Sequence, residues 1–421
     1  MLHHRTFWSL IPVLCLVLAS SCQSNRKLAP GSNPPGQLAP AGAWKPEKLA
    51  ALDDAVMAAV SSNRTPGAVV WLERHGRVHQ GSFGNRSVEP AVESMTVDTI
   101  FDAASLTKVL ATTPAIMKLV EQGRVDPSRS VSTYIPEFAG GGREGITVGH
   151  LLTHTSGLPP GLSRTDGWTG YEAAIQRACR EPLVEPAGAR FRYSDINFIL
   201  LGEVVRRVGG RPLNEFCARE LYGPLGMRDT GFLAVSPGAT TAPAGADLRR
   251  IAPTEKLASG VLRGVVHDPT CRRMGGVAGH AGLFITASDL ARFCRMMLNE
   301  GTLDGHRVFR AETVRAMVAV HSPPGLPRRG WGWDIDSPYA GPRGNRFPIG
   351  GYGHSGWTGT SVWIDPFSKT FVILLANRNH PTEDGNVIPL RRQVGTLAAE
   401  AVVGFDFDHV PGALAPDPAA H

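Results

Sequence analysis

The sequence predicts a mixed α/β (α+β) protein in which helices flank one antiparallel sheet built from both ends of the chain. Strand-like segments rich in β-branched and aromatic residues occur at 67–85 and again at 359–378. The long stretch between them has mainly helical periodicity. Two distant groups of strands separated by helices favour one sheet with a mainly helical domain inserted into it.

Composition supports a globular protein and argues against several other classes. The chain has 421 residues, of which 42% are hydrophobic, and a formal net charge of +6. That length is sufficient for a large core. The lysines and arginines are scattered, and neither a zinc-finger spacing nor an aromatic RNA-binding signature occurs. We therefore expect no nucleic-acid partner and no cofactor.

The N-terminal segment has the pattern of an export signal over residues 1–22. Its apolar run, 7–19, follows a short basic start and is too short for a membrane span. The sequence Ala-Ser-Ser-Cys ending at Cys22 resembles a bacterial lipobox, in which the cysteine is lipidated. We expect a periplasmic or cell-envelope lipoprotein held to the membrane by lipid. Ordinary signal cleavage, with Cys22 incidental, is the alternative.

A flexible tether and one large domain follow the predicted signal. Residues 23–44 are rich in Pro, Gly, Ala and Ser, as in a flexible linker. The domain is predicted over 45–405, with a tail at 406–421. Its sheet region is expected at about 45–100 and 330–405, and its helical region at about 105–320. The elements expected in order are a helix from about 45, strands at 67–76 and 76–85, a helix from 105, strands at 359–366 and 370–378, and a helix at about 390–403.

The cysteines allow two interpretations. If Cys22 is lipidated, four cysteines remain in an oxidising compartment, with three possible pairings. Buried free thiols are an equally good reading. These four are Cys179, Cys217, Cys271 and Cys294.

A serine and a lysine lie one turn apart at the start of the helix expected from residue 105. The pattern S-x-x-K also occurs at Ser24 in the tether, so it carries little information by itself. Around Ser105, however, apolar residues cover most of the helix, and Lys108 shares a face with the serine. A buried lysine loses proton affinity and can then accept a serine proton. The alternative is a lysine that extends its amine from the helix end to solvent.

Two later stretches favour the catalytic interpretation. Tyr193-Ser194-Asp195 precedes an amphipathic helix, and His354-Ser355-Gly356 begins a strand near the C-terminus. S-x-x-K, then Tyr-x-Asn or a variant, then Lys/His-Thr/Ser-Gly is the order found in serine β-lactamases and penicillin-binding proteins. The chain resembles their class-C-like branch, with its DD-peptidases and esterases. The phrases ITVGHLLTHTSGLP, ELYGPLGMRDTGF and GGVAGHAGLFITASDLARF add to a resemblance that spans about 49–403.

The resemblance implies roles for individual residues. Ser105 would be the nucleophile that forms an acyl-enzyme, and Lys108 and Tyr193 would carry its proton as a pair. The backbone N–H groups of Ser105 and Trp357 would form the oxyanion hole. Ser355 and Gly356 would border the substrate. These roles imply a β-lactamase/transpeptidase-like fold.

Two departures bear on the substrate. Asp195 stands where the family often has Asn, and an ionised Asp only accepts hydrogen bonds. Asp195 could instead pair with Lys108 and keep it charged, which would leave Tyr193 as the base. His354 stands where many β-lactamases have Lys, and a neutral His holds a carboxylate less firmly. We expect an exported serine hydrolase for an ester or a D-amino-acid amide, with a small-molecule or peptidoglycan-derived substrate. The alternatives are a class-C-like β-lactamase and a non-catalytic cell-wall peptide or penicillin-binding protein.

A zinc hydrolase is disfavoured. His150 and His154 have the i, i+4 spacing of H-E-x-x-H, but Leu151 stands where the catalytic Glu belongs. No third ligand follows from the spacing. We expect no metal site and a structural role for both histidines beside the following Ser-Gly.

Overall fold

The computed structural model of the protein describes residues 42–163, 165 and 167–416. The predicted signal, Cys22 and almost all of the tether lie outside these residues. No helix in the described part combines the length and the apolar character needed to cross a bilayer. The α-helices are α1 Pro46–Ser61, α2 Thr113–Glu121, α3 Val148–Leu152, α4 Tyr171–Ala178, α5 Asp195–Gly209, α6 Leu213–Cys217, α7 Gly223–Leu225, α8 Pro269–Arg273, α9 Ala287–Leu298, α10 Ala311–Val318 and α11 Ile388–Ala401.

The strands form one large sheet and three small ones. The large sheet has eight strands in the order β11-β12-β13-β14-β15-β1-β2-β3, and every pairing in it is antiparallel. The strand bounds are β1 Gly67–Arg74, β2 Arg77–Ser87, β3 Glu93–Ser94, β4 Phe101–Asp102, β5 Gly231–Phe232, β6 Lys256–Leu257, β7 Gly260–Val261, β8 Leu283–Ile285, β9 Thr302–Leu303, β10 His306–Arg307, β11 Arg328–Arg329, β12 Asp334–Asp336, β13 Tyr352–Ser355, β14 Ser361–Asp365 and β15 Thr370–Ala376.

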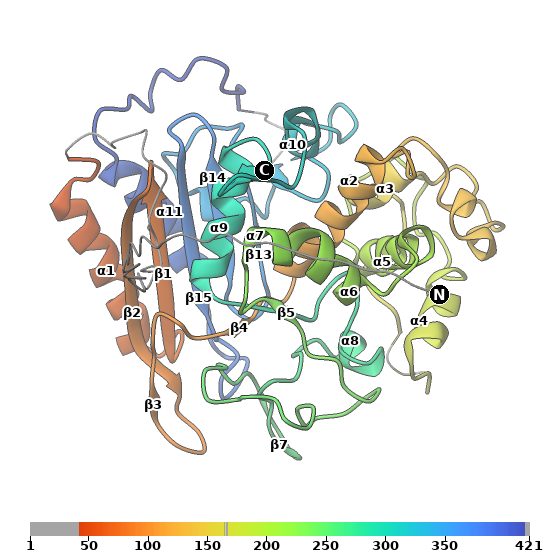
Figure 1. Ribbon diagram of the computed structural model, residues 1–421, viewed down its shortest axis with the longest axis horizontal. Coiled ribbons are helices and arrows are strands. Elements are labelled where there is room, and N and C mark those ends of the chain that lie inside the picture. Colours follow the sequence, from red (N-terminus) through yellow and green to blue (C-terminus); the bar gives the residue numbers. More distant parts are fainter. Residues whose placement is uncertain (1–41, 164, 166, 417–421) are drawn as a thin grey trace, which may run out of the picture. The chain divides into compact units, whose positions relative to one another are not determined.

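The predicted antiparallel sheet built from both ends of the chain is confirmed. β1 near the N-terminal end pairs with β15 near the C-terminal end, with Ala68 opposite Ala376. Helices α1 and α11 cover one face of the sheet, and α9 lies against the other (Figure 1). Side chains alternate between faces along a strand. Val70 therefore packs with α1 and α11, whereas its neighbour Val69 joins the core on the α9 side.

The inserted region is mainly helical, and its core is continuous with the α9 side of the sheet. It also holds the three-stranded sheet β4-β8-β5, which the sequence did not predict. β4 ends at Asp102, directly before the predicted nucleophile. The four cysteines within the described residues are free and buried, so the free-thiol reading is the one observed. They are Cys179, Cys217, Cys271 and Cys294.

The helix expected from residue 105 begins less regularly than predicted. Residues after Ala103 first form tight i→i−3 backbone bonds, for example from Lys108 N–H to Ser105 C=O at 3.0 Å. A π-helical segment follows at Lys108–Thr112, and regular α-helix starts only at Thr113. π-Helical turns are rare in proteins, and those that do form often lie at functional sites.

Candidate active site

Ser105 lies at the tip of a tight turn between β4 and the π-helical segment. Ala104, directly before it, has φ +46°, a left-handed conformation that is uncommon for a residue with a Cβ. A hydrogen bond stabilises the turn, because the Ala104 N–H donates to Asp102 Oδ1 at 2.8 Å. Burial raises the pKa of this Asp102 carboxyl. The conformation leaves Ser105 partly exposed at the surface of a pocket.

Lys108 is fully buried beneath Ser105 and forms a close ion pair. Its Nζ lies 3.0 Å from Ser105 Oγ, 3.0 Å from the His280 carbonyl oxygen and 2.8 Å from Asp195 Oδ1. Burial opposes the charge, but Asp195, and after it Tyr193, outweigh burial and raise the pKa of Lys108. The side chain is therefore an ammonium that donates to Ser105, rather than the neutral amine that burial alone would produce.

Tyr193 faces the same ammonium, with the Lys108 Nζ 5.0 Å from the centre of its ring. The Tyr193 ring also stacks on His154, with ring centres 4.4 Å apart. His154 also holds the backbone on both sides of Tyr193. Its carbonyl accepts from Arg192 N–H at 2.9 Å, and its Nδ1 accepts from Ser194 N–H at 3.1 Å. Burial lowers the pKa of His154 well below its ordinary value, so the ring is neutral.

His150 and His154, for which the sequence predicted a structural role, make different contacts. His150 lies in α3, where its Nδ1 accepts from the Thr147 N–H at 3.2 Å and completes a capping box. His154 lies under Tyr193. The sequence predicted a structural role for His154 but did not connect it to Tyr193. One clue was present in the sequence: the phrase LLTHTSGLP contains His154, and no metal-binding role accounts for a histidine at that position.

The C-terminal motif runs alongside the Ser105 turn. Thr358 Oγ1 donates to the Asp102 carbonyl at 2.8 Å, and Thr360 Oγ1 donates to the Ala103 carbonyl at 3.0 Å. A Cβ on Gly356 would lie 2.6 Å from that Ala103 oxygen. Gly356 is thus required by the neighbouring turn, which the sequence reasoning had not considered.

The expected oxyanion donors fit this arrangement. Neither the Ser105 N–H nor the Trp357 N–H donates a hydrogen bond to any residue within 42–163, 165 and 167–416. Both belong to segments that the threonine bonds tie together. Two such donors beside a nucleophile are the groups that stabilise a tetrahedral oxyanion.

His354 and Ser355, at the end of β13, complete the set of predicted residues. His354 is buried and donates from Nδ1 to the Ser355 carbonyl at 2.8 Å. Burial, and after it the charges of Arg329 and Lys108, lower the pKa of His354 well below its ordinary value. The ring centres of His354 and Tyr193 lie 6.1 Å apart. The structure therefore places a neutral imidazole where a cation would hold a carboxylate.

These residues line or underlie a pocket of about 330 Å³. Four of its polar lining residues were not found from the sequence, because they come from loops remote from the three motifs. The predicted residues in the lining are Ser105, Tyr193, Asp195 and Trp357. The additional ones are His267, Asp268, His280 and Glu383.

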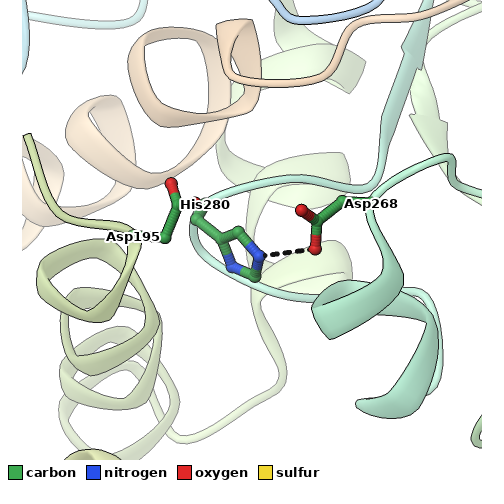
Figure 2. Close-up of side chains that lie close together, drawn as sticks. All are labelled: Asp195, Asp268 and His280. Carbon is green, nitrogen blue, oxygen red and sulfur yellow. Dashed lines mark hydrogen bonds and ion pairs between the residues drawn. The ribbon is translucent and has the colours of Figure 1, made fainter. Parts of the chain in front are cut away.

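Two groups of side chains in and around this pocket have ligand atoms within 4.8 Å of one another. One consists of Asp195, Asp268 and His280, and the other of Glu255, His267 and Glu383. Figure 2 shows His280 between the two aspartates, with its Nε2 bonded to Asp268 Oδ1 at 2.9 Å. In the first group Asp195 is already paired with Lys108, and His280 with Asp268.

Comparison with known proteins places the chain in a family. Residues 50–396 match the family described as Beta-lactamase. A putative D-alanyl-D-alanine carboxypeptidase of Escherichia coli (strain K12) is 31% identical over 353 residues, which cover 76% of this chain and 78% of the relative. An N-acetylmuramyl-L-alanine amidase of Bacillus subtilis (strain 168) is 31% identical over 354 residues, covering 76% and 80%.

Solved structures agree on the fold. A penicillin-binding protein homologue from Caulobacter crescentus superposes with a TM-score of 0.67 at 22% identity, covering 84% of this chain and 98% of that one. EstCE1, a hydrolase with promiscuous acyltransferase activity, gives a TM-score of 0.65 at 23% identity, covering 84% and 99%. The predicted resemblance is confirmed: the chain belongs to the beta-lactamase family of serine hydrolases.

Proposed function

We propose that the protein hydrolyses an ester or a D-amino-acid amide through an acyl-enzyme on Ser105. One observation supports this most strongly: Ser105 Oγ lies at the pocket surface, 3.0 Å from the ammonium of Lys108, beside two backbone N–H groups without acceptors among the described residues. Attack by Oγ on the carbonyl carbon forms the tetrahedral intermediate. The N–H groups of Ser105 and Trp357 stabilise its oxyanion, and collapse expels the alcohol or amine.

Proton transfer in this proposal is assigned to Tyr193. Because Asp195 keeps Lys108 charged, Lys108 cannot accept the serine proton. Tyr193 also faces the ammonium and lines the pocket, and unlike Asp195 it is not held in the ion pair with Lys108. In this proposal it reacts as a phenolate: it takes the serine proton and gives it to the leaving group, and in deacylation it takes a proton from water and gives it to Ser105 Oγ. Lys108 supplies fixed positive charge beside these oxygens.

The substrate is proposed to derive from the cell wall, since the two relatives above bear names of peptidoglycan enzymes. Neutral His354 offers no charge to a substrate carboxylate. We therefore infer that anionic β-lactams are poor substrates, and that neutral esters and amides are turned over better. A charge-assisted hydrogen bond of about 1.5–3 kcal/mol is missing for the anionic class.

Export as a lipoprotein is part of the proposal and depends on residues 1–22. Lipidation at Cys22 would place the enzyme where peptidoglycan fragments occur. Replacing it, Cys22→Ser, is expected to release the mature chain from the membrane fraction or to block processing. A mature N-terminus elsewhere, found by mass spectrometry, would favour secretion without lipid.

The acyl-enzyme is tested by Ser105→Ala with a fluorophosphonate probe and a substrate panel. The panel contains short-chain aryl esters, D-Ala-D-Ala peptides and nitrocefin. We expect the variant to lose both labelling and turnover, whereas Ser355→Ala still takes the label. Label that survives in Ser105→Ala, or maps to Ser194, would refute the assignment. Labelling of the native protein without turnover of any panel member would favour a binding protein.

A further inference from the structure

The pocket beside Ser105 is acidic, although the whole chain carries a formal net charge of +6. Its lining includes Asp195, Asp268 and Glu383 but no lysine or arginine among the described residues. Glu255 does not line the pocket, but one of its carboxylate oxygens lies within 4.8 Å of a Glu383 carboxylate oxygen. An accumulation of one sign of charge inside a cleft focuses the electrostatic field and attracts the opposite charge.

These carboxylates are only partly satisfied by the protein. Asp195 is paired with Lys108. Asp268 Oδ1 accepts from His280 Nε2 and from the Cys271 N–H, but Oδ2 accepts from no described residue. Burial would raise the pKa of Asp268, yet His280 holds it below its ordinary value, so the carboxylate is ionised.

Glu383 repeats this pattern on another side of the pocket. Its Oε1 accepts from Trp357 Nε1 at 2.8 Å and from Asn379 Nδ2 at 3.1 Å and lies 3.2 Å from His267 Nε2, whereas Oε2 accepts from no described residue. The Trp357 side chain is 61% exposed beside it. An acceptor oxygen is therefore left over on each of two carboxylates that line the pocket.

Three arginines around this region donate to backbone carbonyls. Arg272, whose charge acts on Asp268, donates to the carbonyls of Val266 and His267. Arg378 donates to the backbone carbonyls of Trp357, Glu383 and Gly385. Arg391 donates to the carbonyl oxygens of Gly356 and Thr360. None of the three guanidiniums donates a hydrogen bond to a carboxylate of the pocket lining, so the free oxygens of Asp268 and Glu383 stay available.

His280 is another partly satisfied residue in the lining of the pocket. Its side chain is 1% exposed, and Nδ1 has no hydrogen-bond partner among the described residues. The lining of the pocket therefore holds one buried ring nitrogen and two carboxylate oxygens, one on Asp268 and one on Glu383, that have no hydrogen-bond partner among the described residues.

The spacing also suits an ammonium. Oxygen atoms of Asp195 and Asp268 lie within 4.8 Å of each other. A tetrahedral ammonium that donates two hydrogen bonds of about 2.8 Å spans acceptors roughly 4.6 Å apart. The Lys108 ammonium already pairs with Asp195. A second cation that enters from the pocket would contact Asp268 and remain accessible from the open part of the pocket.

We propose that the substrate carries a protonated amine a few bonds from the ester or amide that Ser105 attacks, that Asp268 binds this amine on the side it shares with Asp195, and that Glu383 adds to the negative field which attracts it. The inference rests on the proposed hydrolase function and specifies its substrate class. Asp268 and Glu383 are then specificity-determining residues, whereas Ser105, Lys108 and Tyr193 perform the chemistry.

Two isosteric substrate pairs test the proposal on either side of the scissile bond. The acyl-side pair is the p-nitrophenyl ester of β-alanine and that of butanoic acid, which differ by an ammonium in place of a methyl group. The leaving-group pair is the thioacetate of 2-(dimethylamino)ethanethiol and that of 3-methylbutanethiol. Each kcat/KM is divided by the uncatalysed rate of the same compound. In at least one pair we expect the cationic member to be preferred by roughly tenfold or more.

Variants then locate the preference. Asp268→Asn and Glu383→Gln should each reduce the ratio of cationic to neutral turnover toward one while the neutral member is still hydrolysed. Asp384→Asn is the matched control: it removes a neighbouring carboxylate that bonds to the Thr382 hydroxyl and does not line this pocket, so the native ratio should persist. The native preference should also shrink as salt is added.

The outcomes separate this inference from the proposed function. Turnover of neutral members without preference for a cation in either pair would overturn the amine proposal and leave the hydrolase intact. A preference that survives both Asp268→Asn and Glu383→Gln would also overturn it. No turnover of any member by the native protein, under conditions where Ser105 is not labelled, would instead overturn the hydrolase proposal.

Discussion

Two buried cations, Lys108 and Arg329, have side chains that are completely inaccessible, yet their surroundings differ. Lys108 pairs at 2.8 Å with Asp195, whose side chain remains 33% exposed to the pocket. Arg329 pairs at 3.3 Å with Asp334, which is only 1% exposed, and it also donates to the Gly332 carbonyl. One ion pair faces a pocket and a nucleophile, and the other is enclosed by protein.

The difference shows that burial of a charge does not by itself indicate catalysis. Both pairs overcome a desolvation penalty, and either would be costly to break. Only the Lys108 pair has a serine hydroxyl within hydrogen-bond distance and a partner accessible to substrate. Substitutions at the two sites should therefore affect different quantities, activity at Lys108 and stability at Arg329.

The largest effect is expected at Lys108. Lys108→Met should lower kcat/KM for a neutral ester by about 10⁴-fold, since it removes the charge beside Ser105 and Tyr193.

Asp195→Asn should have a milder effect on kcat/KM and should change its pH profile. Without the carboxylate, burial lowers the pKa of Lys108 against the opposing effect of Tyr193 alone, so the amine begins to act as a base. Steady-state kinetics across pH checks both. Full activity of Lys108→Met would remove the distinction between the two ion pairs.

At Arg329 the expected loss is in stability. Arg329→Met leaves Asp334 buried without its cation, which costs about 3–5 kcal/mol of unfolding free energy. Urea unfolding measures this loss. The double variant Arg329→Met/Asp334→Asn should recover part of it, because no uncompensated charge remains. Any active fraction of Arg329→Met should keep native kcat. A native stability with lost activity would assign Arg329 to the active site instead.

His154 should show an intermediate, positioning effect. His154→Phe keeps a ring under Tyr193 but removes the acceptor for the Ser194 N–H. We expect kcat to fall by up to about 10²-fold with little change in KM, because Tyr193 is displaced rather than the substrate. His150→Phe is the matched control, since that histidine only caps α3. Equal effects of the two variants on kcat would mean that His154 acts through general stability.

The smallest effect is a pH dependence of stability. Burial holds the pKa values of His154 and His354 well below the ordinary value of about 6.5. Below that pH the unfolded chain binds protons that the folded protein does not, so stability present above pH 6.5 is lost as pH falls. Each histidine contributes a slope approaching about 1.4 kcal/mol per pH unit. His354→Asn should remove one such contribution in urea unfolding at pH 7, 6 and 5. An unchanged slope would contradict the buried neutral state of His354.

Much of the fold follows from local pattern. Runs of β-branched and aromatic residues predicted β1 and β15, which are buried along almost their whole length. The spacing of apolar residues predicted α1, because that spacing reports which face of a helix is buried. The three motifs likewise identified Ser105, Lys108 and Tyr193 as neighbours in function. Their order along the chain carried that information.

What only the tertiary structure decided was which distant groups meet. Sequence left open whether Lys108 is neutral, because its pKa depends on the distance to Asp195, and that distance is set by the packing of α5 against the Ser105 turn. The acidic lining contributed by Asp268 and Glu383 has no local signature, since the two residues lie in loops more than a hundred positions apart. Electrostatic interactions fall off with distance in space, not along the chain, and the fold alone fixes that distance.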